Sequence, residues 1–325
     1  MSLRKPLLIS LAIGLAAGLM SYHCLVWRGC FASDFEWPLR AGRALLSKQN
    51  PYAGIPPIGA YPFERWFYYP ILTAIVSIPF ASLNDYFAGA LFFGISSGLL
   101  AYAVASYRPD MWPIFLAAPF FVAAQVAQWS PLLIASILLP VGWDWMLALK
   151  PSIGGALFLY RPSRRSLLLI VCALALSTLA LPSWLLWWLV SVHALAGHPV
   201  PILVLPFGPL LLLALLRWRT PDARLLLGLS IFPQLLFWYD QLPLWLMCRS
   251  WKSCLGLSMV SWVGYMWWRH VAAGLSMQAS VGASWQFVML FVYMPALLVL
   301  LVPPLIGRAK TVTLGRASPA PGPRL

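Results

Sequence analysis

The sequence predicts an all-α, polytopic transmembrane protein. Of its 325 residues, 61% are hydrophobic and only 9% are charged, and the mean hydropathy is +0.81. A water-soluble domain needs far more charged surface than this. Uncharged runs, many of them near the ~20 residues that cross a bilayer, alternate with short basic clusters. We therefore expect about nine to eleven membrane elements in a single domain, residues 1–307.

The first uncharged run, 6–27, follows Arg4 and Lys5. It is longer than the core of a signal peptide and no small-residue cleavage site follows it, so we expect a retained helix with a cytoplasmic amino end. Later apolar runs, divided where Pro and polar residues gather, predict the other elements of the first half. These are 70–83, 86–107, two elements within 111–150 broken near 125–131 and kinked at Pro140 and Gly142, and a half-helix or re-entrant turn at 151–160.

The second half divides in the same way. The uncharged run 166–216 must hold an even number of crossings, because basic clusters flank both ends, and we expect two, broken around 193–201. The remaining predicted elements are 225–239, a short return at 241–250, 253–268 and 285–307. The tail 308–325 is basic and rich in Pro, which predicts a disordered cytoplasmic segment.

Basic clusters set the expected orientation. The strongest cluster is Arg161, Arg164 and Arg165, and similar clusters occur at 217–224 and 308–310. Such clusters mark cytoplasmic loops. Because the amino end is also expected in the cytoplasm, residues 28–65 should by parity form a loop on the outer face of the membrane, although this loop is itself rich in Arg. These clusters also account for the net charge of +14, and we expect membrane lipid and no nucleic acid as a partner.

The loop 28–65 holds three of the eight acidic residues, Asp34, Glu36 and Glu64. A carboxylate at a membrane interface suits general-base catalysis, because partial burial raises its pKa toward neutrality. In the alternative interpretation, Asp34 and Glu36 cap a helix and pair with Arg40 or Arg43. Both interpretations stay open at this point.

Lys150 is the second notable charge, because an ammonium at the end of an apolar segment is costly unless it holds an anion. It could bind a phosphate, extend to the interface, or pair with Asp144. Arg40, Arg43 and Arg65 are further phosphate candidates, although a loop of this size also places some Arg side chains in water.

Nucleotide and metal motifs are absent from the sequence. It has no P-loop pattern, no G-x-G-x-x-G fingerprint, and no Cys-x-x-Cys or His/Cys spacing typical of a metal site. We therefore expect no cofactor, although the Asp34-x-Glu36 pair could hold a hard cation. Any activated group must come from a separate donor, and a lipid-linked donor is the simplest one inside a membrane.

Several motifs resemble those of the C-type membrane glycosyltransferases (GT-C fold). Ser33-Asp34-Phe35, Asn50-Pro51-Tyr52 and Phe67-Tyr68-Tyr69-Pro70 resemble the start of the bacterial branch that uses polyprenyl-phosphate sugars, including the late mannosyltransferases of phosphatidylinositol mannosides. Leu147-Ala148-Leu149-Lys150-Pro151 resembles its Leu-x-x-Lys-Pro turn, and Trp238-Tyr239-Asp240 a late Tyr/Asp turn. Ile71 replaces a Pro, and Ala127-Gln128-Trp129-Ser130 stands where that family has Gly-Gln-x-Asn. The likeness covers roughly residues 1–170.

This resemblance implies an integral protein of the bacterial inner membrane that transfers a hexose, most simply mannose, from a polyprenyl-phosphate-sugar donor to a lipid or glycan acceptor at the outer face. Transfer would invert the anomeric centre, with Asp34 as the general base and no bound metal. The implied substrate-binding residues are Glu36, Arg40, Arg43, Tyr52, Arg65, Tyr68, Lys150, Tyr239 and Asp240. The alternatives are a transporter or flippase of a lipid-linked saccharide, which should show internal repeats, and a catalytically silent assembly subunit.

Overall fold

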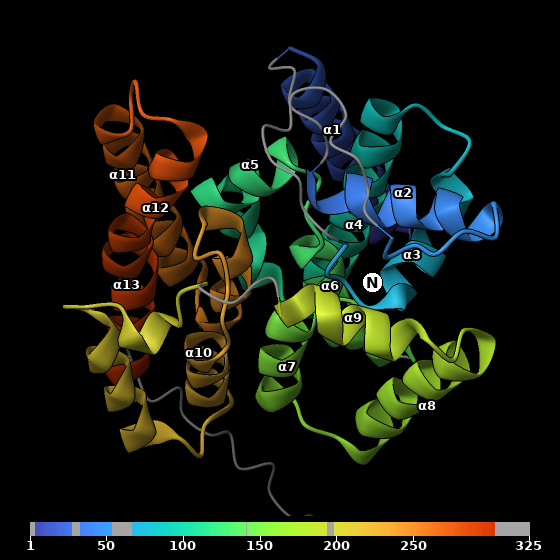
Figure 1. Cartoon of the computed structure of the whole chain (residues 1–325). Coiled ribbons are helices and arrows are strands. Elements are labelled where there is room, and N and C mark those ends of the chain that lie inside the picture. The colour runs from blue at the N-terminus through green and yellow to red at the C-terminus, as the bar shows by residue number, and fades with distance from the viewer. Residues whose placement is uncertain (1–3, 28–32, 54–66, 141, 194–197, 303–325) are drawn as a thin grey trace, which may run out of the picture.

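The computed structural model describes residues 4–27, 33–53, 67–140, 142–193 and 198–302. Within these ranges every regular element is helical and no strand occurs, which confirms the predicted all-α class (Figure 1). The first elements are α1 (Arg4–Trp27), α2 (Ser33–Leu46), α3 (Ile71–Ser77), η1 (Ile78–Phe80), α4 (Asp85–Tyr107), η2 (Pro109–Leu116), α5 (Ala118–Gln125), α6 (Ser130–Leu138), η3 (Trp143–Ala148) and α7 (Pro151–Tyr160). They are followed by α8 (Arg164–Ala180), α9 (Trp184–His193), η4 (Pro201–Leu203), η5 (Gly208–Arg217), α10 (Pro221–Ile231), η6 (Trp238–Met247), α11 (Trp251–Val271), α12 (Met277–Val288), η7 (Met289–Tyr293) and α13 (Met294–Leu301).

Three helices of the described chain are long and apolar enough to cross a membrane: α1, α4 and the continuous helix Ala279–Leu301. A fourth span results if α8 and α9, which meet at an angle of 107°, are counted as one bent span. The apolar helices support a membrane protein, but most of the nine to eleven expected elements are too short to be complete spans. Pro and Gly divide the apolar runs into 3₁₀ segments and short helices.

Some of the predicted boundaries agree with the structure and others do not. Helix α4 matches 86–107, α7 matches the half-helix at 151–160, and the break between α5 and α6 falls inside 125–131. The expected span at 70–83 is instead the short pair α3 and η1, with Pro79 inside η1. In the run 166–216 a sharp bend comes earlier than expected, because Pro182 lies between α8 and α9. The tail 308–325 lies outside the described residues.

Helices α1 and α4 pack along their length through glycines. A Cβ added to Gly94 would lie 2.9 Å from the carbonyl oxygen of Gly14, so the two backbones are already in close contact. The Ser10 hydroxyl donates a hydrogen bond of 2.7 Å to the carbonyl of Gly98. Small residues permit this approach, which is how membrane helices associate without a hydrophobic driving force between them.

Four arginines join the ends of neighbouring helices through backbone carbonyls. Each guanidinium donates to a carbonyl of another element, which satisfies groups that a helix carboxyl end leaves unpaired. The bonds run from Arg108 to Leu246 (3.2 Å) and Cys248 (2.9 Å), from Arg161 to Ile137 (2.8 Å), from Arg217 to Leu300 (2.9 Å) and from Arg224 to Leu159 (2.8 Å).

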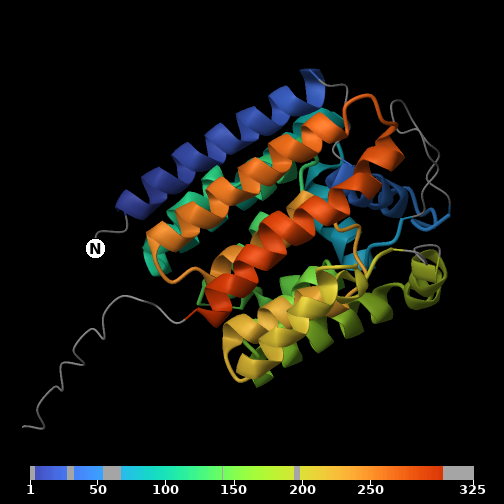
Figure 2. The same cartoon turned by 90° about the vertical axis from the view of Figure 1, so that its left-hand side faces the viewer.

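Figure 2 shows the start of α1 and the end of α13 at one end of the molecule, and α2 at the other.

The packing of α1 on α4 gives the first prediction. Gly94→Ala should lower the melting temperature, because overpacking a close contact costs about 1–3 kcal/mol. Gly256→Ala in α11 is the matched control, because its added Cβ would meet nothing within 4 Å. That control should be neutral or stabilising, since Ala favours a helix by about 1 kcal/mol over Gly. Equal melting of the two variants in detergent would contradict the tight α1–α4 contact.

Candidate functional site

Lys150 lies at the turn between η3 and α7, and this turn is fixed by its neighbours. Pro151 is the first residue of α7, where a missing N–H costs nothing. The Gly154 N–H donates a hydrogen bond of 2.7 Å to the carbonyl of Lys150. A Cβ on Gly154 would come within 1.8 Å of the Leu147 carbonyl oxygen, so only glycine lets η3 fold back this closely on α7. The backbone therefore presents the lysine side chain in one direction.

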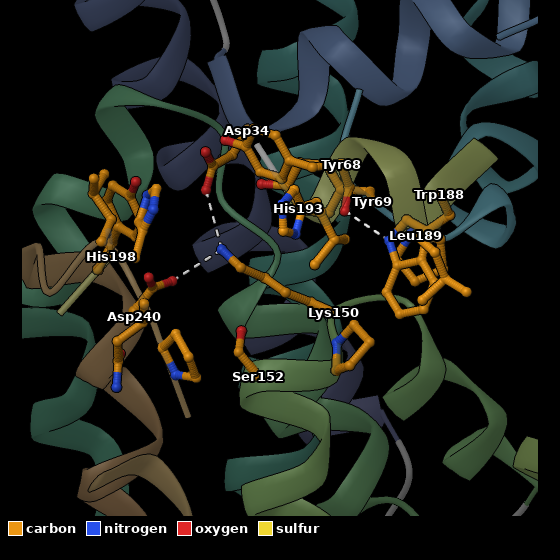
Figure 3. Close-up of a pocket in the computed structure, with 17 residues that line it drawn as sticks. Asp34, Tyr68, Tyr69, Lys150, Ser152, Trp188, Leu189, His193, His198 and Asp240 are labelled. Atoms are coloured by element: carbon orange, nitrogen blue, oxygen red, sulfur yellow. Dashed lines mark hydrogen bonds and ion pairs between the residues drawn. The ribbon is translucent and has the colours of Figure 1, made fainter. Parts of the chain in front are cut away.

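The ammonium of Lys150 holds two carboxylates from distant parts of the chain (Figure 3). Its Nζ lies 3.3 Å from Asp34 Oδ2 and 2.9 Å from Asp240 Oδ1. Gln128 Nε2 donates to Asp34 Oδ2 and, at 3.2 Å, to Asp240 Oδ1. We call these four residues the charged cluster. All four are largely withdrawn from solvent, and they come from α2, the turn between α5 and α6, the start of α7, and η6.

The turn between α5 and α6 positions both acids. The Asp34 N–H donates to the Val126 carbonyl at 3.2 Å, and the Trp129 indole donates to the Asp34 carbonyl at 2.8 Å. Ser130 Oγ donates to the carbonyl of Tyr239, next to Asp240, at 3.1 Å. Ala127 adopts φ +48, a left-handed conformation that glycine accepts most readily. A strained turn of this kind persists only where surrounding contacts hold it.

The charged cluster carries two carboxylates for one ammonium. Burial raises the pKa of Asp34, Lys150 opposes this rise, and the nearby Asp240 adds to it. Burial lowers the pKa of Lys150, but the two carboxylates outweigh burial and leave it raised. Lys150 therefore stays positively charged, and Asp34 takes up a proton more readily than an exposed aspartate does.

The charged cluster opens into a cavity of about 570 Å³, which we call the polar cavity. Aromatic side chains form much of its wall, and the Lys150 Nζ lies 5.8 Å and 5.4 Å from the ring centroids of Tyr69 and Tyr239. Other residues that line it include Tyr68, Trp188, His193, His198 and Gln234. A cavity of this size, mainly apolar with a few convergent polar groups, is typical of a small-molecule site.

Five of the sequence-predicted residues line the polar cavity: Asp34, Tyr68, Lys150, Tyr239 and Asp240. Tyr52 is buried behind the wall, where its hydroxyl donates a 2.9 Å hydrogen bond to the carbonyl of Tyr69. Arg65 lies outside the described residues.

Glu36, Arg40 and Arg43 form a second cluster that does not line the polar cavity. Arg40 pairs with Glu36, and Arg43 Nη1 lies 2.6 Å from Asp85 Oδ1 at the start of α4. Arg43 also donates to the Ala81 and Leu83 carbonyls, at 2.8 and 2.7 Å. Burial raises the pKa of Glu36 to about 7, against the opposing effect of Arg40. The Glu36–Arg40 pair is the one that the helix-pairing alternative predicts, but Asp34 pairs with Lys150 instead, and Arg43 pairs with Asp85.

The structure adds residues to the site and changes one pairing. Lys150 pairs with Asp34 and Asp240, not with Asp144. Gln128 lies at the centre of the charged cluster. The sequence feature that points to it is an amide side chain in an otherwise apolar turn between two helices. His193 and His198 also line the polar cavity, but nothing in their spacing distinguishes them from histidines elsewhere in the chain.

The charged cluster generates a stability prediction. Lys150→Met should cost about 3–5 kcal/mol, because it leaves buried carboxylates without their cation. Adding Asp240→Asn to that variant should recover most of the loss, because only Asp34 then needs neutralising and it can take up a proton. Lys252→Met on the exposed start of α11 is the control, and should stay within about 0.5 kcal/mol of the parent. Thermal unfolding in detergent measures all four proteins, and a double variant that melts no higher than Lys150→Met would refute the charge coupling.

Comparison of the chain with protein-family models, with curated proteins and with solved structures finds no match in any of the three. The described geometry and the motifs quoted above are therefore the basis on which a function is proposed.

Proposed function

We propose that this protein is an inverting membrane glycosyltransferase that moves a hexose from a polyprenyl-phosphate donor to a hydroxyl of a lipid or glycan acceptor. The observation that carries the proposal is the charged cluster, in which a buried aspartate and a fixed lysine share one wall of an aromatic-lined cavity. An acid that can accept a proton beside a cation that can hold a phosphate meets the two main needs of such a transfer.

The transfer needs one base and one site for the leaving group. Asp34 takes the proton of the acceptor hydroxyl, whose oxygen forms a bond to the anomeric carbon of the donor. The bond between that carbon and the phosphate oxygen breaks, and its electron pair leaves with the polyprenyl phosphate. A single displacement of this kind inverts the anomeric centre and requires one base rather than two carboxylates acting in turn.

Lys150 links the two halves of this reaction. In the structure its ammonium contacts both carboxylates, and the contact with Asp240 is the shorter one. A donor phosphate at Nζ would compete with Asp34 for the lysine, which raises the proton affinity of Asp34 when the substrate is bound. Asp240 and the Gln128 amide then hold the lysine and the base in position relative to each other.

The cavity wall suits a sugar and an anionic group. Tyr68, Tyr69, Tyr239 and Trp188 offer flat faces against which a hexose ring packs. His193 and His198 provide further hydrogen-bonding groups in the lining of the same cavity, on different sides of Lys150 in Figure 3. By the resemblance above, the hexose is mannose and the site opens to the outer face of a bacterial inner membrane.

The function has a direct test. Purified protein in sealed proteoliposomes is given radiolabelled polyprenyl-phosphate mannose and a membrane lipid extract, and labelled product is separated from donor. We expect transfer by the parent and by Asp110→Asn, an exposed acid outside the cavity, and a loss of about 10²–10⁴-fold in Asp34→Asn, the usual contribution of a general base. Transfer within tenfold of the parent by Asp34→Asn would remove Asp34 as the base. Movement of intact donor across the bilayer without transfer would favour a flippase.

The pH dependence tests the role of Asp34 separately. The rate should rise with pH as Asp34 loses its proton, and burial should place this limb above the ordinary range of an aspartate. Because Asp240 helps to raise the pKa of Asp34, Asp240→Asn should move the acidic limb to lower pH. A limb that stays in place in a profile of kcat/KM against pH would mean that another group titrates.

A further inference from the structure

A second cavity of about 510 Å³ adjoins the polar cavity, and we call it the apolar chamber. The two share Pro70, Pro151 and Trp188 in their linings. Pro151 directly follows Lys150, so the junction lies next to the ammonium of the charged cluster. A ligand that binds Lys150 through one end therefore lies beside the residues that line both cavities, and its other end is within reach of the chamber.

The chamber is bounded by one face of α7 and one face of α8. Gly154, Gly155 and Phe158 line it from α7, at the spacing of one helix face. Ile170 and Leu174 line it from α8, again one turn apart. From Pro151 to Phe158 the helix rises about 10 Å, which is the length of the chamber wall that α7 supplies.

The polar groups of the chamber are already paired within the protein. The Thr178 hydroxyl donates to the Leu174 carbonyl at 2.9 Å and accepts from the Trp184 indole at 3.1 Å. The Trp188 indole donates to the carbonyl of Tyr68 at 2.8 Å. No polar side chain of this lining is left to recognise a sugar or a phosphate, and water would find few partners there. The part of a ligand that fits is a hydrocarbon chain.

We infer that the apolar chamber binds the phosphate-proximal isoprene units of the lipid donor, about two of them, and that the rest of the chain lies in the bilayer. An isoprene unit adds four main-chain carbons, roughly 5 Å when extended, given a C–C bond of ~1.5 Å. The inference rests on the proposed function, because it takes the ligand at Lys150 to be a lipid phosphate. According to this inference, the protein recognises the first isoprene units of the lipid donor. The length of the chain beyond those units does not affect binding.

The test fills the chamber and changes the lipid. Ile170→Trp and Leu174→Trp both place an indole in the chamber from α8. Val171→Trp is the matched control, because Val171 is the next residue of the same helix and is 52% exposed outside the chamber. Mannose-phosphate donors with a single methyl group, with two isoprene units and with a long polyprenyl chain are compared in the transfer assay, together with the melting temperature of each variant.

In the parent and in Val171→Trp, the two-unit donor and the long donor should have KM values within about threefold of each other, and the methyl donor a KM at least about tenfold higher. Both chamber variants should raise the KM of the prenyl donors about tenfold or more and leave that of the methyl donor within about twofold. Equal KM values for all three donors in the parent, or equal effects of Ile170→Trp and Val171→Trp, would overturn the inference while transfer itself upheld the proposed function.

Photolabelling keeps the two hypotheses separable. A prenyl phosphate with a diazirine on its second isoprene unit should label the α8 peptide in the parent and in Val171→Trp, but not in the chamber variants. A parent that is labelled there but transfers no sugar would refute the glycosyltransferase and leave the lipid site. Labelling that a diacyl phosphatidic acid suppresses as well as unlabelled prenyl phosphate does would show that the chamber takes acyl chains, and would refute isoprenoid recognition.

Discussion

The arrangement of the site depends on one constraint, the neutralisation of a lysine that is almost wholly removed from water. An isolated buried ammonium is costly, so Lys150 requires carboxylates close by, and it has two of them. Asp34 comes from the first part of the chain and Asp240 from the last third, so satisfying one cation brings α2, α7 and η6 together. The same contacts that offset the burial of charge assemble an acid, an amide and a cation around one cavity.

Broken helices supply the turns on which this site is built. Gln128 lies between α5 and α6, Lys150 between η3 and α7, and Asp240 in the 3₁₀ segment η6. A continuous helix would point such side chains along its own face, whereas turns bring them inward from several directions. The short elements that reduce the number of complete spans are thus the ones that carry the polar groups. Irregular backbone inside an apolar protein is tolerated where it lines a cavity or is buried.

The sequence predicted the helical class, the ends of α4 and α7, and five residues of the cavity, because each depended on a local signal such as Pro151, an uncharged run or a rare acid. It did not predict which charges would pair. Asp144 is close to Lys150 in sequence, yet the partners are Asp34 and Asp240, which only the tertiary fold brings near. Arg40 and Arg43 carry the charge that a phosphate needs, but their acidic neighbours on α2 and α4 already engage them. The expected spans also failed where a single Pro, such as Pro182, outweighed the hydropathy of a long run.

The arginines at the helix ends combine two roles, one that depends on their charge and one that depends on the geometry of the guanidinium group. Arg161, Arg217 and Arg224 belong to the basic clusters from which the sequence predicts the orientation, and the same guanidinium groups donate to carbonyls at the ends of neighbouring helices. A lysine at any of these positions would keep the insertion signal but offers no planar fork of donors. Homologous chains with Lys in place of Arg at these positions would therefore insert in the same orientation but form a looser helix bundle. In such sequences the number of arginines, rather than the charge alone, would indicate how tightly the helix ends are joined.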